Sequence, residues 1–246
     1  MAGVDVIWLA VVGGALLAGF VQGLSGFGFG LTAMSIWAWM LDPALAATLA
    51  VSGALTGQIL AAIFVRRSWD MQVLWPFLAG GLCGVPVGVW VLPYLDMRLF
   101  KLVLGTFLVL WCPTMLLISR FPRITAGGRL ADAVVGWAGG VMGGLGGFTG
   151  TLPTLWCTLR GLSKDHQRGI IQNFNLAMLC VAMLMYVTQG IVTTDMLPYM
   201  AAVSAVVVIP VLMGTRVYVG ISDQRFRQIV LGMLTLSGAV MLLSIS

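Results

Sequence analysis

The chain has 246 residues, of which 60% are hydrophobic and only 9% are charged. This composition excludes an ordinary soluble domain, in which about 25% of the residues are charged. Its net charge of +5 would suggest nucleic-acid binding in a soluble protein, but arginines kept on one side of a membrane explain it more simply. We therefore predict an all-α polytopic membrane protein that contacts lipid and binds no nucleic acid.

Apolar runs follow one another along the whole chain, and a bilayer-spanning helix needs about 20 such residues. We predict apolar helices at 4–22, 27–41, 44–65, 72–94, 99–119, 130–146, 149–159, 169–190, 196–215 and 226–245. The segments 27–41 and 149–159 are short for a complete crossing. No basic region precedes the first run, so we expect it to belong to the mature protein and not to a cleaved signal peptide.

A glycine-rich motif occurs twice, and each copy overlaps the start of one of the two short segments. Residues 23–30 read GLSGFGFG and residues 144–150 read GLGGFTG, and a shift of 121 residues (147 − 26) pairs Gly26 with Gly147. Each glycine costs about 1 kcal/mol of helix propensity relative to alanine, so the motifs predict breaks in the helices. Matched breaks in two halves of an apolar chain are typical of a transporter's substrate site.

A polar linker at 120–129 divides the chain into an N-terminal repeat, 1–119, and a C-terminal repeat, 130–246, within one membrane domain. Suppose that each glycine-broken unit is a re-entrant hairpin and every other segment crosses once. The basic loops 66–67, 120–129, 160–168 and 216–227 then lie on one side, which the positive-inside rule makes cytoplasmic. Only Arg98 and Lys101 lie opposite. The two repeats then have inverted topology, each with a broken hairpin and three transmembrane helices, as in many secondary transporters.

A helix that begins inside the membrane after a glycine turn presents unpaired N–H groups and the positive end of its dipole, which suits an anion. We expect hydroxyls near the turns and amides of the following helix to assist. The predicted substrate-binding residues are Gly23, Ser25, Gly26, Phe27, Gly28, Thr32, Gly147, Phe148, Thr149, Thr151, Gln172, Asn173 and Asn175. Two alternatives stay open: the glycines only allow close helix packing, and the amides only satisfy the hairpin backbone.

Other chemistry has little support in the sequence. No carboxylate falls clearly inside a predicted span, and there is no Walker A loop, metal-ligand cluster or catalytic triad, so we predict neither an enzyme nor a cofactor. The only histidine, His166, is expected in a solvated turn. We expect the tryptophans near the short segments to anchor at the membrane interface. These are Trp37, Trp39, Trp137 and Trp156.

Residues 19–30, GFVQGLSGFGFG, resemble the first motif of the sulfite exporter TauE/SafE family, and residues 145–153, LGGFTGTLP, resemble its second motif. The similarity covers essentially the whole chain, including the polar stretch from Arg168 to Asn175. It implies a bacterial inner-membrane permease for small sulfur-containing anions such as sulfite, sulfoacetate or other organosulfonates, working as importer or exporter. The second motif lacks the double proline of some members, which leaves the substrate open.

An anion channel of the same fold and a non-transporting membrane scaffold subunit are the alternative functions that the sequence leaves open, and a homo-oligomer is compatible with any of them.

Overall fold

The computed structural model describes residues 2–64, 70–117, 124 and 127–217, and parts of the segment 231–243. Within these ranges the secondary structure is helical, which confirms the predicted all-α fold. Two 3-10 turns, Leu92–Tyr94 and Thr194–Met196, accompany the α-helices. The α-helices are α1 (Ala2–Ser25), α2 (Phe29–Trp37), α3 (Pro43–Phe64), α4 (Met71–Val91), α5 (Met97–Leu117), α6 (Gly128–Gly146), α7 (Thr151–Leu159), α8 (Lys164–Thr188) and α9 (Leu197–Val217).

Six of the described helices are long and apolar enough to cross a membrane, namely α1, α3, α4, α5, α8 and α9. The helices α2 and α7 have only 9 residues each. At 1.5 Å per residue each is about 14 Å long, less than half of the roughly 30 Å hydrocarbon core. Both predicted short segments are therefore confirmed as helices that cannot cross a bilayer alone.

The predicted helix breaks lie at the glycine motifs. After α1 the backbone turns through Gly26 and Gly28, with φ of 78° and 96°, and after α6 it turns through Gly147, with φ of 77°. Glycine adopts this left-handed conformation without the strain that a Cβ would cause. We call α1 and α2 with residues 26–28 between them hairpin 1, and α6 and α7 with residues 147–150 between them hairpin 2.

Each hairpin packs against a helix from the other half of the chain. The two most extensive helix pairs are α4 with α6 and α1 with α9. Gly23 of α1 lies directly against the backbone carbonyl of Val211 in α9, and Gly84 of α4 lies against that of Trp137 in α6. Small residues let helix backbones approach this closely. The packing alternative therefore accounts for the position of Gly23.

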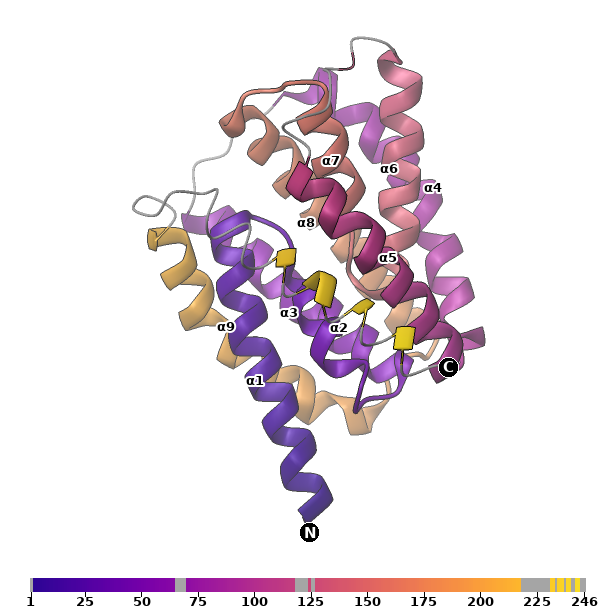
Figure 1. The fold of residues 1–246 in the computed structure, drawn as a ribbon, viewed down its shortest axis with the longest axis vertical. Coiled ribbons are helices and arrows are strands. Elements are labelled where there is room, and N and C mark those ends of the chain that lie inside the picture. The colour runs from indigo at the N-terminus through magenta and orange to yellow at the C-terminus, as the bar shows by residue number, and fades with distance from the viewer. Residues whose placement is uncertain are drawn as a thin grey trace.

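The contacts also fix the direction of the helices. The pairs α1/α9 and α4/α6 are parallel, and α8 is parallel to α4, since Phe77 contacts Phe174 and Gly81 contacts Met178. A short connection makes α9 antiparallel to α8, so α1 and α6 run in opposite directions (Figure 1). Hairpin 1 opens toward the N-terminus at the bottom of Figure 1, and hairpin 2 opens toward the top. The inverted repeat and its division at 120–129 stay predictions.

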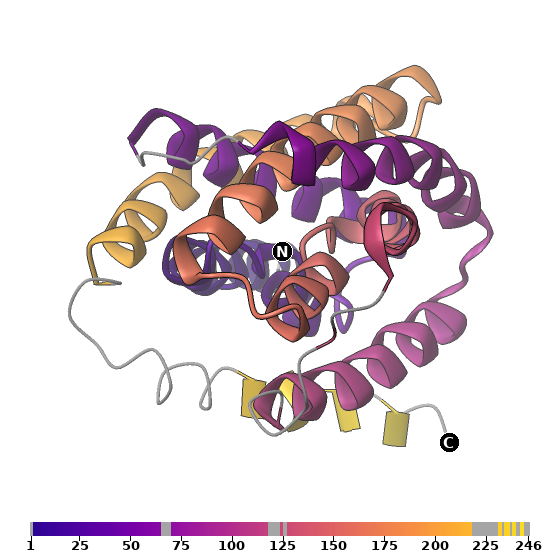
Figure 2. The same cartoon turned by 90° about the horizontal axis from the view of Figure 1, so that it is seen from above.

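The two hairpins occupy the centre of the molecule in a view from above (Figure 2). Helices α3, α4, α8 and α9 pack together on one side of them. Helix α5 and the described parts of 231–243 cover the other side, where Gly238 lies against Leu108 of α5. The rings of Phe107 in α5 and Phe148 in hairpin 2 are 6.5 Å apart, so α5 reaches the second glycine motif.

Most of the described arginines lie at one end of the bundle, because of the directions in which their helices run. We call this the basic end. Arg129, Arg160, Arg168 and Arg216 lie toward it, and Arg98 and Lys101 lie toward the opposite end. Arg66, Arg67, Arg120, Arg123, Arg225 and Arg227 fall outside the described residues. Which end faces the cytoplasm stays a prediction.

His166 lies in a helix and not in the turn that the sequence predicts, although its side chain is 32% exposed. Helix α8 begins at Lys164, so His166 lies in its first turn. Its Nε2 is 3.1 Å from Oδ2 of Asp70, the residue that caps α4. The charged run therefore joins the starts of two helices at the basic end.

Candidate functional site

The tips of the two hairpins touch each other. A Cβ on Gly30, in the first turn of α2, would lie 2.8 Å from the carbonyl oxygen of Gly147 in hairpin 2. A Cβ on Gly150 would lie 3.0 Å from Cβ of Phe27 in hairpin 1. Both distances are shorter than an ordinary contact, so the absence of a side chain at these glycines allows the tips to meet.

A cavity lies between the two tips, and we call it the central cavity. Both hairpin turns line it, together with residues of α1, α3 and α8. The space inside admits little more than a sphere the size of a water molecule. The structure brings seven of the predicted site residues to this cavity: Phe27, Gly28, Gly147, Phe148, Thr149, Thr151 and Asn175.

Two helix N-termini begin at the central cavity. Helix α2 starts after Gly28 and α7 starts after Gly150, and neither N-cap forms a side-chain hydrogen bond. The first N–H groups of a helix have no partner inside the helix and carry partial positive charge. The second tip offers fewer donors, because Thr151 N–H donates to the carbonyl of Phe148 at 3.2 Å and Pro153 has no N–H.

The threonine hydroxyls at the second tip shape its turn. Oγ1 of Thr151 donates to the carbonyl oxygen of Phe148 at 2.7 Å, and Thr154 donates to that of Gly150. Thr149 is 1% exposed and lines the cavity. The hydroxyl proton of Thr151 is thus already used within the protein, which leaves its oxygen as an acceptor.

Amide side chains form the polar wall of the cavity. Asn175 of α8 is 2% exposed and its amide lies against Gly150, and its Oδ1 has no hydrogen-bond partner among the described residues. Gln22 of α1 donates from Nε2 to the carbonyl of Ala54 at 2.8 Å. Gln58 of α3 donates from Nε2 to the carbonyl of Gly26 at 2.9 Å.

Gln22 and Gln58 line the cavity although the predicted site omits them. Both are amides inside long apolar helices, and a buried amide costs free energy unless it is hydrogen-bonded. That signal was present in the sequence, but the hairpin contacts that place the two side chains at the cavity depend on the fold.

The other predicted site residues lie elsewhere. Gly23, Gly26 and Gln172 line a second, smaller hollow. Ser25 is exposed and donates within its own turn to the carbonyls of Val21 and Phe27. Thr32 and Asn173 are buried, but neither lines the two hollows. The structure does not bring these last three residues to the central cavity, and their part in substrate binding stays a prediction.

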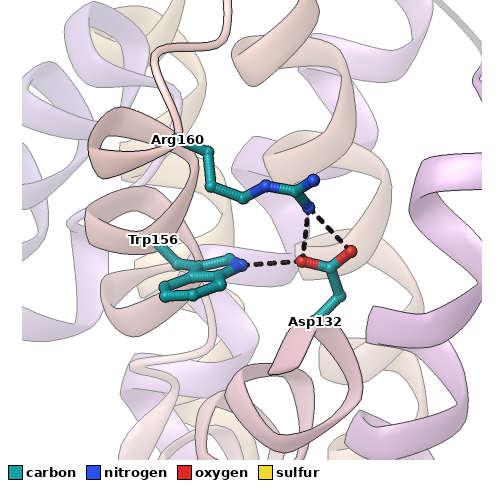
Figure 3. A network of polar contacts seen from close by, with 3 residues as sticks. All are labelled: Asp132, Trp156 and Arg160. Carbon is teal, nitrogen blue, oxygen red and sulfur yellow. Dashed lines mark hydrogen bonds and ion pairs between the residues drawn. The ribbon is translucent and has the colours of Figure 1, made fainter. Parts of the chain in front are cut away.

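A partly buried ion pair ties the two helices of hairpin 2 together near the basic end (Figure 3). Nη1 of Arg160 is 2.8 Å from Oδ1 and 2.9 Å from Oδ2 of Asp132, and Nε1 of Trp156 donates to Oδ1 at 2.7 Å. The side chain of Asp132 is only 5% exposed, and these hydrogen bonds offset part of the cost of burying its carboxylate. The pair holds the end of α7 to the start of α6.

The expectation that all four tryptophans near the short segments are interface anchors is wrong for two of them. Trp156 bonds to Asp132, and Trp37 is fully buried with Nε1 donating to the carbonyl of Ala10 at 2.9 Å. Trp39 and Trp137 are exposed, and their role as interface anchors stays a prediction.

The comparison with known families identifies the chain. The family model described as "Sulfite exporter TauE/SafE" matches residues 11–241, which is nearly the whole sequence. Searches of curated proteins and of solved structures found no significant match. Members of this family are membrane transporters of small anions and not enzymes, and the six apolar helices agree with a multi-pass inner-membrane protein. The chain belongs to the sulfite exporter TauE/SafE family.

Proposed function

We propose that this protein is a secondary transporter of small sulfur-containing anions, such as sulfite, sulfoacetate or other organosulfonates, and that the central cavity binds them. The observation that carries this proposal is the meeting of two glycine-capped helix N-termini at one cavity. An anion there would accept hydrogen bonds from main-chain N–H groups and lie at the positive ends of both helix dipoles.

The lining of the cavity suits a compact oxyanion. Within the described part of the chain, the lining residues are uncharged, and they present main-chain N–H groups, threonine hydroxyls and the amides of Gln22, Gln58 and Asn175. A sulfite or sulfonate group has three oxygens, which such donors can contact from several sides. Binding by dipoles and amides, without a buried cation, also keeps release possible, as transport requires.

Transport then requires the tips to separate. The central cavity is too small for an oxyanion in the described conformation, and it is closed by direct contact between Gly30 and the turn of hairpin 2. Because the hairpins run in opposite directions, movement of one against the other opens the cavity toward one end of the bundle at a time. This is the behaviour expected of a transporter with inverted repeats.

The test is flux through purified protein in proteoliposomes, with sulfite, sulfoacetate and taurine supplied separately and protein-free liposomes as the control. Saturable uptake of at least one of these anions, with a matching rise in melting temperature in detergent, would support the proposal. Flux that rises linearly with concentration would instead indicate a channel. A folded protein that neither binds nor moves any small oxyanion would indicate the scaffold role and overturn the proposal.

A further inference from the structure

The second hollow lies between the central cavity and the basic end. It is lined by the last turns of α1, α3 and α9 and by the first part of α8, and the residues that matter here are Gln22, Gly26, Gln58, Gln172 and Thr215. All of these helix segments lie toward the basic end. We call this space the basic-end hollow. In the described conformation it admits no water-sized sphere, so it must widen before an anion can enter it.

Gln22 and Gln58 separate the two hollows, since both residues line both of them. Each is nearly fully buried and each crosses between α1 and α3, Gln22 donating to Ala54 of α3 and Gln58 donating to Gly26 after α1. The amide of Gln22 lies against Gly57, where a Cβ would be 2.5 Å from its Oε1. The partition therefore consists of two amide side chains, each hydrogen-bonded between α1 and α3.

A cation lies beside the basic-end hollow. At Gly26 a Cβ would be 3.2 Å from Nε2 of Gln172 and 3.7 Å from Cγ of Arg168. The guanidinium of Arg168 reaches the carbonyl of Gly23, at 3.5 Å. Gln172 lines the hollow, so an anion in it would find an amide on the wall and a positive charge near the edge.

Among the described residues, the glycine turn of hairpin 2 has different neighbours at the matching place. The shift of 121 residues that pairs Gly26 with Gly147 also pairs Gln172 with Val51. In hairpin 2, a Cβ on Gly147 would lie 3.5 Å from the backbone of Ala50 and Val51. One glycine turn thus faces an amide and an arginine, and the other faces the backbone of Ala50 and Val51.

We propose that the basic-end hollow is the route by which the anion passes between the central cavity and the basic end, with the amides of Gln22 and Gln58 as its gate. Gln172 and Arg168, which lie against Gly26, form a second, weaker anion site at its edge. The positive charge of Arg168 attracts anions toward the basic-end hollow. Two weak sites in series allow both binding and release. This inference rests on the proposed function, since it assumes an anion as cargo.

The first test measures access to the hollow by thiol labelling and does not depend on transport. Exposed Cys83 and Cys180 are first replaced by serine, and buried Cys112 and Cys157 are kept. Thr215→Cys places a thiol in the hollow. The reagent is 2-sulfonatoethyl methanethiosulfonate, which is an impermeant organosulfonate, applied to vesicles of each orientation.

Two further variants serve as matched controls for the labelling. Leu130→Cys reports the side of the basic end, because Leu130 is 79% exposed at the start of α6. Val91→Cys is the counterpart of Thr215→Cys in the first half, by the alignment of Pro86 with Pro210, and both residues are partly buried. We expect Thr215→Cys to be labelled only from the side that labels Leu130→Cys, and Val91→Cys to remain unlabelled. Labelling of Thr215→Cys from the other side, or none from either side, would overturn the route.

The second test addresses the charge. Arg168→Gln should raise the sulfite concentration for half-maximal transport roughly tenfold at low ionic strength, the effect of losing one charge-assisted hydrogen bond. It should also remove most of the salt dependence of transport, whereas Arg168→Lys should retain it. If Arg168 only caps the end of α1, Arg168→Gln would lower the melting temperature and leave the half-maximal concentration unchanged, which would overturn the second site. A wild-type protein that moves no anion would contradict the proposed function instead, and the labelling result could still be read.

Discussion

The contact between the hairpin tips gives the sharpest prediction, for which the change is Gly30→Ala. The new Cβ would lie 2.8 Å from the carbonyl oxygen of Gly147 and 2.9 Å from that of Gly146. Both are backbone atoms and cannot rotate away. An ordinary contact needs 3.4 Å, so the tips must separate by about 0.6 Å, the difference from 2.8 Å.

The magnitudes separate an effect on transport from an effect on folding. Overpacking of this kind destabilises the fold by about 1–3 kcal/mol, and the better helix propensity of alanine in α2 stabilises it by about 1 kcal/mol. The net destabilisation should therefore be roughly 0–2 kcal/mol, and the protein should remain folded. Displacement of a binding group by about 1 Å can cost on the order of 100-fold in rate, so we expect at least a tenfold loss of transport here.

The assay is initial uptake into proteoliposomes at equal protein content, combined with thermal unfolding in detergent. Gly13→Ala in α1 is the matched control, since nothing lies within 4 Å of a Cβ at that position. Uptake by Gly30→Ala equal to that of Gly13→Ala would refute the idea that the tip contact positions the substrate. Loss of folded Gly30→Ala protein would show that the contact mainly holds the fold.

Three further outcomes are expected. Asn175→Leu should lower transport at least tenfold. The melting temperature should stay equal or rise, because the change removes a buried oxygen that has no partner among the described residues, and a loss of stability that matches the loss of transport would contradict this. Asp132→Ala should destabilise the protein by roughly 1–2 kcal/mol, which is less than the loss of a fully buried ion pair would cost, since Arg160 is 28% exposed. A double-mutant cycle with Arg160→Ala should show that the two residues are coupled, and additive effects on stability would contradict this. Tyr186→Phe should cost about 1 kcal/mol through the lost bond to the carbonyl of Gly144 and leave the half-maximal substrate concentration unchanged, as titration of uptake would show.

Local features of the sequence predict the helices and their breaks well. Apolar length alone places each described helix within a few residues of its observed bounds; α8 differs most, beginning at Lys164 instead of residue 169. The positive φ at Gly26, Gly28 and Gly147 follows from the dense glycines of the motifs. These features depend on residues close together in the chain, where propensity and hydropathy decide the outcome.

Features that depend on distant contacts could not be predicted. Gly23 belongs to the glycine motif, yet it packs against α9, which lies nearly the length of the chain away. Gln22 and Gln58 form a partition only because α1 and α3 lie side by side with Gly57 between them. Trp37 and Trp156 have the amphipathic character of interface residues, but each finds a hydrogen-bond acceptor inside the protein. Hydropathy does not distinguish these environments.

Each hairpin packs against a helix from the other half of the chain, and this has a consequence for biosynthesis. Among the helices with complete bounds, α1 leaves the ribosome first, but α9, the helix it contacts most extensively, leaves it last. Until then the glycine face of α1 contacts lipid or a chaperone of the insertion machinery. Helix α6, in contrast, finds α4 already in the membrane. Two fragments split at the linker 120–129 should therefore each be incomplete when expressed alone and should regain a stable fold only when they are made together.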